Sequence, residues 1–177
     1  MRIPTRHGDQ FEQVYRDSYP AVLAYALRRV PRAEAEDATA ETFAIAWRRR
    51  SAVPKPSIPW LIGVARRVLA NGARSQRRQT ALVHRLGVGG PVAVWDPEVA
   101  DCDPTLRKGL ERLSNAERET LLLVAWEGLT PTEVATALGC TPAAARLRLR
   151  RARRHLTAAL SLGDSAAAPD ASEGVLT

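Results

Sequence analysis

Apolar residues recur at helical spacing through most of the chain, and no stretch of useful length alternates between apolar and polar residues as a strand does. Phe11 and Tyr15 begin the first apolar stripe, and Ser18 with Pro20 predicts that the helix restarts there. Residues 11 to 78 are therefore predicted to be helical apart from one loop. The predicted fold class is all-α.

The segment from Ala33 to Arg50 is predicted to form an amphipathic helix. The side that faces the core carries Ala35, Thr39, Phe43, Ala46 and Trp47. The opposite side carries Asp37, Ala40, Glu41, Ala44 and Arg48. From the residues alone, an ordinary solvated helix face explains this second side.

Residues 51–59 contain three prolines, so they are predicted to form a stiff loop. A further helix is predicted from Trp60 to about Arg78, and the pair Asn71-Gly72 leaves open whether that helix is continuous. Its outward side carries Arg66, Arg67, Arg74, Arg77 and Arg78, with Asn71 at their margin.

The composition changes after this helix. Residues 80–103 contain glycines, prolines and an acidic cluster, as an interdomain linker does. We predict a first domain over residues 10–79, a flexible linker over 80–103, a second domain over 104–162 and a disordered tail over 163–177. The simpler interpretation is that this linker is a solvated tether. The alternative is that its acidic residues dock transiently on the basic segments on either side.

The second domain contains a capping box formed by Ser114 and Glu117. The helix that follows it is predicted to stop at Gly128. This helix is predicted to bury Leu121, Leu122, Ala125 and Trp126.

Two further helix starts follow at once. Thr130 and Glu133 form a second capping box around a proline, and Gly139 is predicted to end the short helix in the left-handed conformation. Thr141 then caps a longer second helix. Two helices joined by a Gly-Cys-Thr turn form the helix-turn-helix pattern, whose second helix lies in the major groove of DNA.

A helical wheel of the second helix separates an apolar side from a basic one. The stripe predicted to pack inward consists of Ala145, Leu149, Ala152, Leu156 and Leu160. The opposite side is centred on Ala143, Leu147, Arg150 and Arg154, flanked by Arg146 and Arg151. A basic, solvated helix that binds nothing specific is the alternative, but the caps and the turn spacing favour a docking motif.

The charge of the chain supports a nucleic-acid partner. Lys and Arg total 26 against 19 Asp and Glu, which gives a formal net charge of +7. Almost all of the positive charge is arginine, and an Arg-rich basic protein most often meets nucleic acid because phosphate binding releases counterions. A GC-rich genome also enriches arginine and alanine, so composition alone does not decide whether the protein binds nucleic acid.

Other classes of protein find little support. Cys102 and Cys140 are far apart, and His7, His84 and His155 are isolated from one another and from carboxylate pairs. We therefore expect no enzyme, no metal and no cofactor. The chain has neither an apolar N-terminal run nor a segment of the roughly 20 apolar residues that cross a bilayer, so we expect a cytoplasmic protein without a signal peptide.

Two sets of residues carry a resemblance to a known family. Ala35-Glu36-Asp37, Glu41-Thr42-Phe43, Ala46-Trp47 and Pro59-Trp60-Leu61, with the basic helix behind them, resemble conserved region 2 of bacterial RNA polymerase sigma factors. Residues 113–156 resemble sigma region 4. Two small helical domains joined by a linker resemble the extracytoplasmic-function (ECF) group of the sigma-70 family, and the match covers about residues 10–160.

The resemblance implies three sets of contacts. The −35 promoter element would be read as duplex by Thr141, Ala143, Arg146, Leu147, Arg150, Arg151 and Arg154. The −10 element would be read as single-stranded DNA by Lys55, Ser57, Arg66, Arg67, Asn71, Arg74, Arg77 and Arg78. Polymerase would be contacted by Asp37, Glu41 and Arg48. In the family, Leu147 usually corresponds to a small polar residue and Ala145 to a branched apolar one.

The resemblance also implies the partners. They are core RNA polymerase, through the clamp of its β′ subunit and through the β flap at region 4, together with promoter DNA and a cognate anti-sigma factor. The expected place of action is the nucleoid. Two alternatives remain: a stand-alone helix-turn-helix regulator, which would bind duplex DNA without polymerase, and an interaction protein that occupies polymerase without reading DNA.

Overall fold

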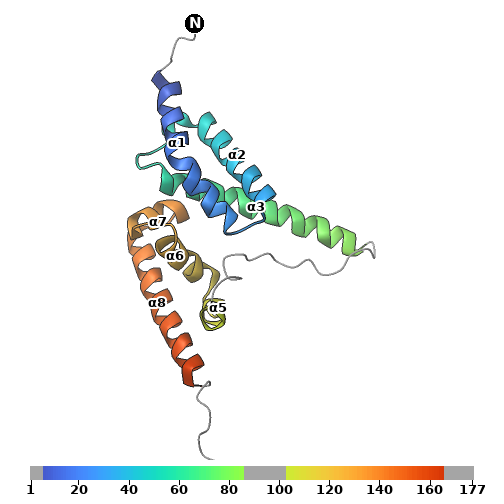
Figure 1. Ribbon diagram of the computed structural model, residues 1–177, viewed down its shortest axis with the longest axis vertical. Helices are drawn as coiled ribbons and strands as arrows, with labels where there is room; N and C mark the ends of the chain where they lie inside the picture. The colour runs from blue at the N-terminus through green and yellow to red at the C-terminus, as the bar shows by residue number, and fades with distance from the viewer. Residues whose placement is uncertain (1–5, 86–102, 166–177) are drawn as a thin grey trace, which may run out of the picture.

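The computed structural model describes residues 6–85 and 103–165. Over these ranges the chain forms seven α-helices, one 3₁₀ helix and no strand, so the predicted all-α class is confirmed (Figure 1). The first group of helices is α1 (Arg6–Leu27), α2 (Arg32–Arg48), the 3₁₀ helix η1 (Arg50–Ala52) and α3 (Ile58–Arg85). The second group is α5 (Pro104–Glu111), α6 (Asn115–Ala125), α7 (Pro131–Leu138) and α8 (Pro142–Ser165).

The first group is a three-helix bundle in which α1, α2 and α3 each contact the other two. Val22 and Tyr25 of α1, Phe43 of α2 and Leu61 of α3 are buried in its centre. The second half of α3 extends beyond this bundle (Figure 1). The bundle therefore presents a long helix with a free surface.

The second group is arranged around α8, which contacts α5, α6 and α7. Its buried and half-buried stripe is the predicted one and consists of Ala145, Leu149, Ala152, Leu156 and Leu160. Gly109 allows α5 to lie close to this stripe, because a Cβ atom there would be 2.9 Å from Leu156 Cδ1. The apolar side of α8 is thus covered along its length.

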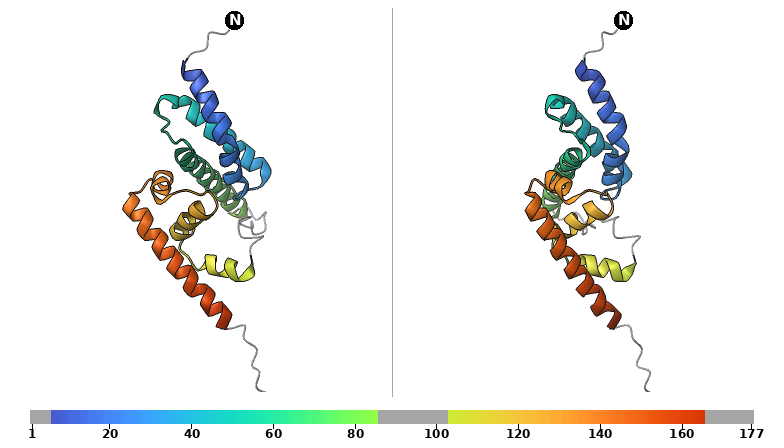
Figure 2. Two further views of the ribbon diagram at one scale, coloured as in Figure 1. Left: turned by 60° about the vertical axis from the view of Figure 1, so that its left-hand side comes forward. Right: turned by 90° about the vertical axis from the view of Figure 1, so that its left-hand side faces the viewer.

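The two groups also pack on each other. Helix α7 lies against α3, and the views in Figures 1 and 2 show it beneath the bundle. One hydrophobic core includes Tyr25 and Ile62 from the first group and Leu123, Val134 and Ala137 from the second. The described helices are therefore joined by a continuous apolar core.

The predicted capping devices are confirmed. Ser114 with Glu117 and Thr130 with Glu133 form complete capping boxes at the starts of α6 and α7. Gly139 ends α7 with a φ of 66°. Asp103, which belongs to the acidic cluster of the predicted linker, caps α5 by accepting bonds from the backbone N–H groups of Thr105 at 2.8 Å and Leu106 at 3.2 Å.

Several predicted boundaries were wrong. Helix α1 does not restart near Ser18 but is continuous through Pro20. Pro20 has no N–H to donate to the carbonyl oxygen of Arg16, and both residues are exposed to solvent. Helix α3 is continuous through Asn71-Gly72, which the sequence left open, and it reaches Arg85, so residues 80–85 are helical and do not belong to the linker. Helix α8 likewise includes residues 163–165. The rest of the predicted linker and tail lies outside the described residues.

Two assignments of core residues also require correction. Trp47 is 46% exposed, because it lies at the end of α2 and only the N-terminal part of α1 packs beside it. In α6, Ala125 is exposed and Leu123 is fully buried. A single inward stripe was assumed for α6, whereas this helix packs against α8 and α7 and contributes Leu123 to the core shared with the first group.

Candidate nucleic-acid interface

The outward side of α8 is free in the structure. Every residue of the predicted −35 set is exposed: Thr141, Ala143, Arg146, Leu147, Arg150, Arg151 and Arg154. Leu147, the most apolar of them, is 50% exposed, whereas Ala145 beneath it is fully buried. Helix α8 therefore presents a basic side to solvent while its apolar side is fixed to α7 and α6.

The start of α8 is also formed as predicted. Thr141 Oγ1 accepts a hydrogen bond from the backbone N–H of Ala144 at 3.2 Å. Arg148 differs from the other arginines of this helix, because it is half-buried and its Nη1 lies 4.0 Å from Cys140 Sγ in the turn. Arg148 therefore supports the turn rather than the exposed basic side.

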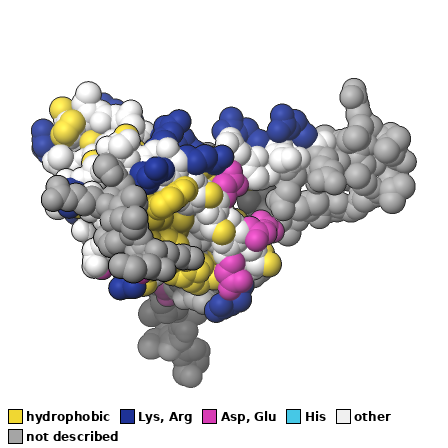
Figure 3. All heavy atoms as spheres, turned by 90° about the horizontal axis from the view of Figure 1, so that it is seen from above, with side chains coloured by type: hydrophobic (Ala, Val, Ile, Leu, Met, Phe, Trp, Pro, Cys, Tyr) yellow, Lys and Arg dark blue, Asp and Glu magenta, His cyan; other side chains and the backbone are white. Residues whose placement is uncertain are grey.

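The arginines of α3 form a second basic surface. Arg66, Arg67, Arg74 and Arg78 are exposed, and Figure 3 shows basic side chains along the projecting part of this helix. Arg74 donates to Asn71 Oδ1 at 3.0 Å and to the carbonyl oxygen of Ala70 at 3.2 Å. The side chain of Arg77 lies outside the described residues.

The loop before α3 contains two residues that were predicted to contact DNA, and they differ in how exposed their side chains are. Lys55 is exposed, whereas Ser57 is half-buried and its Oγ lies 3.0 Å from the Oγ of the buried Ser18. This hydrogen bond attaches the loop to α1. Ser57 therefore has a structural partner, and its contact with DNA stays a prediction.

The Ser18–Ser57 bond predicts a measurable loss of stability. Ser57→Ala leaves the buried Ser18 hydroxyl without its partner, which costs about 1–3 kcal/mol of unfolding free energy. Chemical denaturation measures this loss. Removing both hydroxyls in Ser18→Ala/Ser57→Ala should cost less than the two single changes added together, and additive costs would contradict the bond.

An exposed aromatic side chain lies beside the loop, where the sequence pattern predicted a buried one. The guanidinium carbon of Arg50 lies 4.7 Å from the centroid of the Trp47 ring, and the Phe11 ring packs edge-on at 5.0 Å. An exposed ring beside a cation is suited to stack on an unpaired base. The signal available in the sequence was a tryptophan and an arginine three residues apart, immediately before the proline-rich loop.

Helix α2 presents the predicted polar side. Asp37, Glu41 and Arg48 are exposed, and Glu34 adds a further carboxylate to the same side of the helix. Figure 3 shows acidic side chains next to the projecting arm of α3. The bundle thus carries an acidic surface beside a basic one.

The carboxylates of the capping boxes have altered acidity. The hydroxyl and the backbone N–H of Thr130 both donate to Glu133 Oε2 and lower the pKa of Glu133 below its ordinary value of 4.5. The Ser114 hydroxyl acts in the same way and lowers the pKa of Glu117. In their ionised form these carboxylates stabilise the starts of α7 and α6.

A pH dependence follows from the lowered pKa of Glu133. A group whose pKa is lower in the folded protein stabilises it above the unfolded pKa, and this stabilisation is lost as the pH falls through the folded pKa. The difference in Tm between wild type and Glu133→Gln should therefore shrink as the pH is lowered below about 4.5. Glu111→Gln, which removes an exposed carboxylate outside a capping box, is the control. A difference that stays constant down to pH ~3 would exclude ionised Glu133 as the source of the stabilisation.

Neither a metal centre nor a membrane span is found in the part of the chain that the structure describes. No group of three or more His, Cys, Asp or Glu residues among residues 6–85 and 103–165 is arranged to hold a metal ion. None of the helices in these ranges combines the length and the apolar character that crossing a bilayer requires.

The chain matches two families of known proteins. Residues 14–79 match Sigma-70 region 2, and residues 105–156 match Sigma-70, region 4. The first match covers most of the α1–α3 bundle, and the second covers α5 to α8. The two basic surfaces therefore lie one in each matched region.

Individual relatives give the same result. RNA polymerase sigma factor CarQ of Myxococcus xanthus is 32% identical over 150 residues, which cover 81% of this chain and 84% of CarQ. RNA polymerase sigma factor NccH of Alcaligenes xylosoxydans xylosoxydans is 30% identical over 155 residues, which cover 78% of this chain and 80% of NccH. Alignments of this length extend over parts of both matched regions.

A solved structure has a similar fold. The sigma factor RpoE of Bartonella quintana, in its complex with the anti-sigma factor NepR, superposes with a TM-score of 0.61 and 25% identity. The superposition covers 87% of this chain and 98% of RpoE. The chain therefore belongs to the sigma-70 family of bacterial RNA polymerase sigma factors, in its extracytoplasmic-function group, and directs RNA polymerase to promoters.

Proposed function

We propose that this sigma factor reads the −35 element with the exposed side of α8 and the −10 element with α3 and the loop before it. The observation that carries the proposal is the exposed basic side of α8, held above a buried apolar stripe by a complete helix-turn-helix. Sigma factors are non-catalytic initiation factors, so these surfaces serve binding alone. A protein with this role acts on the nucleoid, in the cytoplasm.

The two elements require different kinds of contact. Arg146 and Arg150 are free to approach base edges in a major groove, where arginine pairs with guanine through two hydrogen bonds. Leu147 offers an apolar surface for a thymine methyl group and no hydrogen bond. On α3, Arg67 and Arg74 follow the backbone of a separated strand, and the exposed ring of Trp47 provides a stacking surface beside the loop.

The polymerase contact is assigned to the acidic side of α2. Asp37, Glu41 and Arg48 are exposed on this side, and the family resemblance directs them to the clamp of the β′ subunit. Region 4 would meet the β flap. An anti-sigma factor is a further partner, supported by the similarity to an RpoE chain solved with NepR.

The polymerase contact is tested by reversing charge on α2. Asp37→Lys/Glu41→Lys should weaken binding to purified core polymerase at least about tenfold in a fluorescence titration, because two attractive charge contacts become repulsive. Glu36→Lys is the matched control, since it lies about 100° away around the same helix and its exposed pair with Arg32 contributes little. Equal weakening by the control would show a general charge effect and exclude this surface.

The same titration separates the proposed function from a stand-alone regulator. The sigma factor should bind core polymerase tightly and show specific promoter binding in the complex. A chain that binds duplex DNA specifically but does not bind core polymerase would overturn the proposal. The comparisons with known proteins do not favour that alternative.

A further inference from the structure

Aromatic side chains pair in two steps between the start of α1 and the end of α2. Phe11 packs edge-on against Trp47 with ring centroids 5.0 Å apart, and Tyr15 packs against Phe43 with centroids 4.7 Å apart. Phe43 is buried, whereas Trp47 is 46% exposed and Tyr15 is 41% exposed. The paired rings therefore present one exposed aromatic side chain from each helix.

The two exposed rings lie at the end of the bundle that is away from the α5–α8 domain. Figure 1 shows the start of α1 and the end of α2 side by side there, whereas α7 packs against α3 on the other side of the bundle. The loop before α3 borders both rings. It is entered through η1 just after Trp47, and near its other end Ser57 is bonded to Ser18, three residues after Tyr15.

Arg50 is held over one of these rings. Its guanidinium carbon lies 4.7 Å from the centroid of the Trp47 ring, and its Nη1 donates to the Trp47 carbonyl oxygen at 3.2 Å. Both contacts are with Trp47, so they orient the guanidinium before any ligand arrives. Bases stack on aromatic rings and on the planes of arginine guanidinium groups alike. The Trp47–Arg50 pair is therefore a preformed stacking surface.

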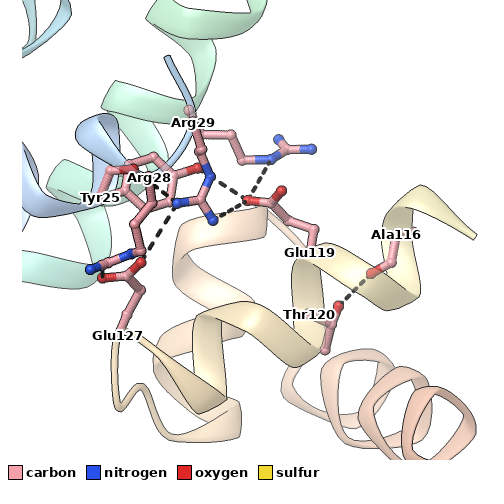
Figure 4. A network of polar contacts seen from close by, with 8 residues as sticks. Tyr25, Arg28, Arg29, Ala116, Glu119, Thr120 and Glu127 are labelled. Carbon is pink, nitrogen blue, oxygen red and sulfur yellow. Dashed lines mark hydrogen bonds and ion pairs between the residues drawn. The ribbon is translucent and has the colours of Figure 1, made fainter. Parts of the chain in front are cut away.

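A second arginine–aromatic pair in the same bundle shows how an enclosed pair differs. The Arg29 guanidinium carbon lies 3.6 Å from the centroid of Tyr25, which is buried. The Tyr25 hydroxyl donates to Glu119 Oε1 at 3.1 Å, and Arg29 Nη2 lies 3.8 Å from the same oxygen (Figure 4). By contrast, Trp47 and Arg50 are exposed, and no carboxylate within residues 6–85 and 103–165 forms an ion pair with Arg50. Arg50 is thus available to a ligand.

The charges around the exposed rings favour a nucleic acid as that ligand. Three exposed arginines, Arg48 to Arg50, follow Trp47 directly, and the exposed Lys55 continues the positive charge into the loop. The exposed carboxylate of Glu12 on α1 is already paired with Arg16. Proteins that bind single strands combine cations for the phosphate groups with rings for the bases. Apolar contact with another protein would not require these cations.

The spacing of the two rings favours an unpaired strand over a duplex. Trp47 is level with Phe11, and Tyr15 is four residues further along α1, so the two exposed rings are offset by about 6 Å along the helices. Successive bases in a duplex are only about 3.4 Å apart. Two neighbouring bases therefore reach both rings only in an extended, unpaired strand.

We propose that Tyr15, Trp47 and Arg50, which we call the aromatic shelf, bind unpaired bases of the promoter strand that passes along the loop before α3. One base stacks on the Trp47–Arg50 pair and a second on Tyr15. This proposal rests on the proposed function, in which α3 and the loop bind the −10 element. The aromatic shelf adds affinity for bases next to that element without a sequence preference, because every base has a face that stacks.

Photo-cross-linking locates the bases in the unaltered protein. The full chain is irradiated with a single strand of mixed sequence, about 12 nucleotides long, in which 5-bromouracil replaces thymine, and the cross-linked peptides are identified by mass spectrometry. We expect cross-links to Tyr15 and Trp47, which should disappear when the same strand is in a duplex. Absence of single-strand cross-links to both rings would overturn the aromatic shelf.

Substitutions measure the affinity that the aromatic shelf contributes. Trp47→Leu should weaken binding of a fluorescein-labelled single strand at least about fivefold, because one stacked base is lost. Arg50→Lys keeps the charge but loses the guanidinium plane, so it should weaken binding at least about twofold with an unchanged slope of log K against log salt. Trp126→Leu and Arg32→Lys make the same replacements elsewhere and should bind as the wild type does. Wild-type affinity in both shelf variants would exclude the aromatic shelf.

A titration with core polymerase tests for a protein on the same surface. Trp47→Leu should bind core polymerase as tightly as the wild type. Weaker binding to polymerase, with unchanged affinity for the single strand, would make this surface a protein contact and overturn the proposal. If the shelf variants lose affinity for the strand but the wild type supports no transcription with core polymerase, the aromatic shelf stands and the proposed function fails.

Discussion

Arg146→Ala/Arg150→Ala should abolish the ability of the sigma factor to distinguish promoters by their −35 element. Each arginine that pairs with guanine contributes about 1–3 kcal/mol of discrimination, or about 5- to 150-fold per contact. Transcription from a promoter that depends on this element should therefore fall by at least about 30-fold. Both arginines are exposed on α8 and are available for this contact.

The measurement is transcription in vitro from an intact promoter and from one with a scrambled −35 element. The wild type should prefer the intact promoter strongly, and the double variant should transcribe both at a similar low level. Arg153→Ala is the matched control, because it removes one exposed arginine from the flank of the same helix. An unchanged preference in the double variant would exclude α8 as the reader of the −35 element.

Leu123→Ala should destabilise the whole protein by about 2–5 kcal/mol, because it removes a fully buried side chain from the core shared by both groups of helices. This is a large part of the roughly 5–15 kcal/mol typical of a domain. The loss is measured as the free energy of unfolding in denaturant. The half-buried neighbour Leu121 provides the control, and Leu121→Ala should cost less.

The shape of the same denaturation curve carries further information. If the two groups share one core, probes in both should report one transition that shifts to lower denaturant in Leu123→Ala. A shift confined to the second group, with the bundle unfolding at its original midpoint, would contradict a shared core.

Local features of the fold were predictable because they depend on a few neighbouring residues. Thr130, Glu133 and Gly139 specify the start and end of α7 through side-chain hydrogen bonds and one left-handed residue, and all three behave as predicted. The apolar stripe of α8 is equally local, because its period fixes which side chains share a face. The exposed positions of Arg146 and Arg150 follow from that stripe.

Features that depend on contacts between distant segments were not predictable. The sequence pattern placed Leu121 and Ala125 in the core and passed over Leu123, because the pattern does not reveal that α6 also meets the core of the first group. Trp47 fits the inward pattern of α2 but lies at its end, where little covers it. The pairing of Glu127 with Arg28 joins residues 99 apart, and no local signal indicates it.

The position of Ala145 illustrates the same distinction. The family usually has a branched apolar residue at this position, yet the smaller Ala145 is fully buried and belongs to the shared core. Helices α7 and α8 are in contact, and both contribute buried residues to that core. Whether a small side chain leaves a gap depends on how closely the neighbouring helices approach it. The sequence alone does not show that distance.

The most direct test of promoter-directing activity is run-off transcription with purified core polymerase on genomic DNA, followed by mapping of the start sites. We predict discrete start sites that require the sigma factor and share two upstream sequence elements at a fixed separation. Transcripts identical to those of core polymerase alone, from a chain that still binds duplex DNA, would contradict a role in promoter selection.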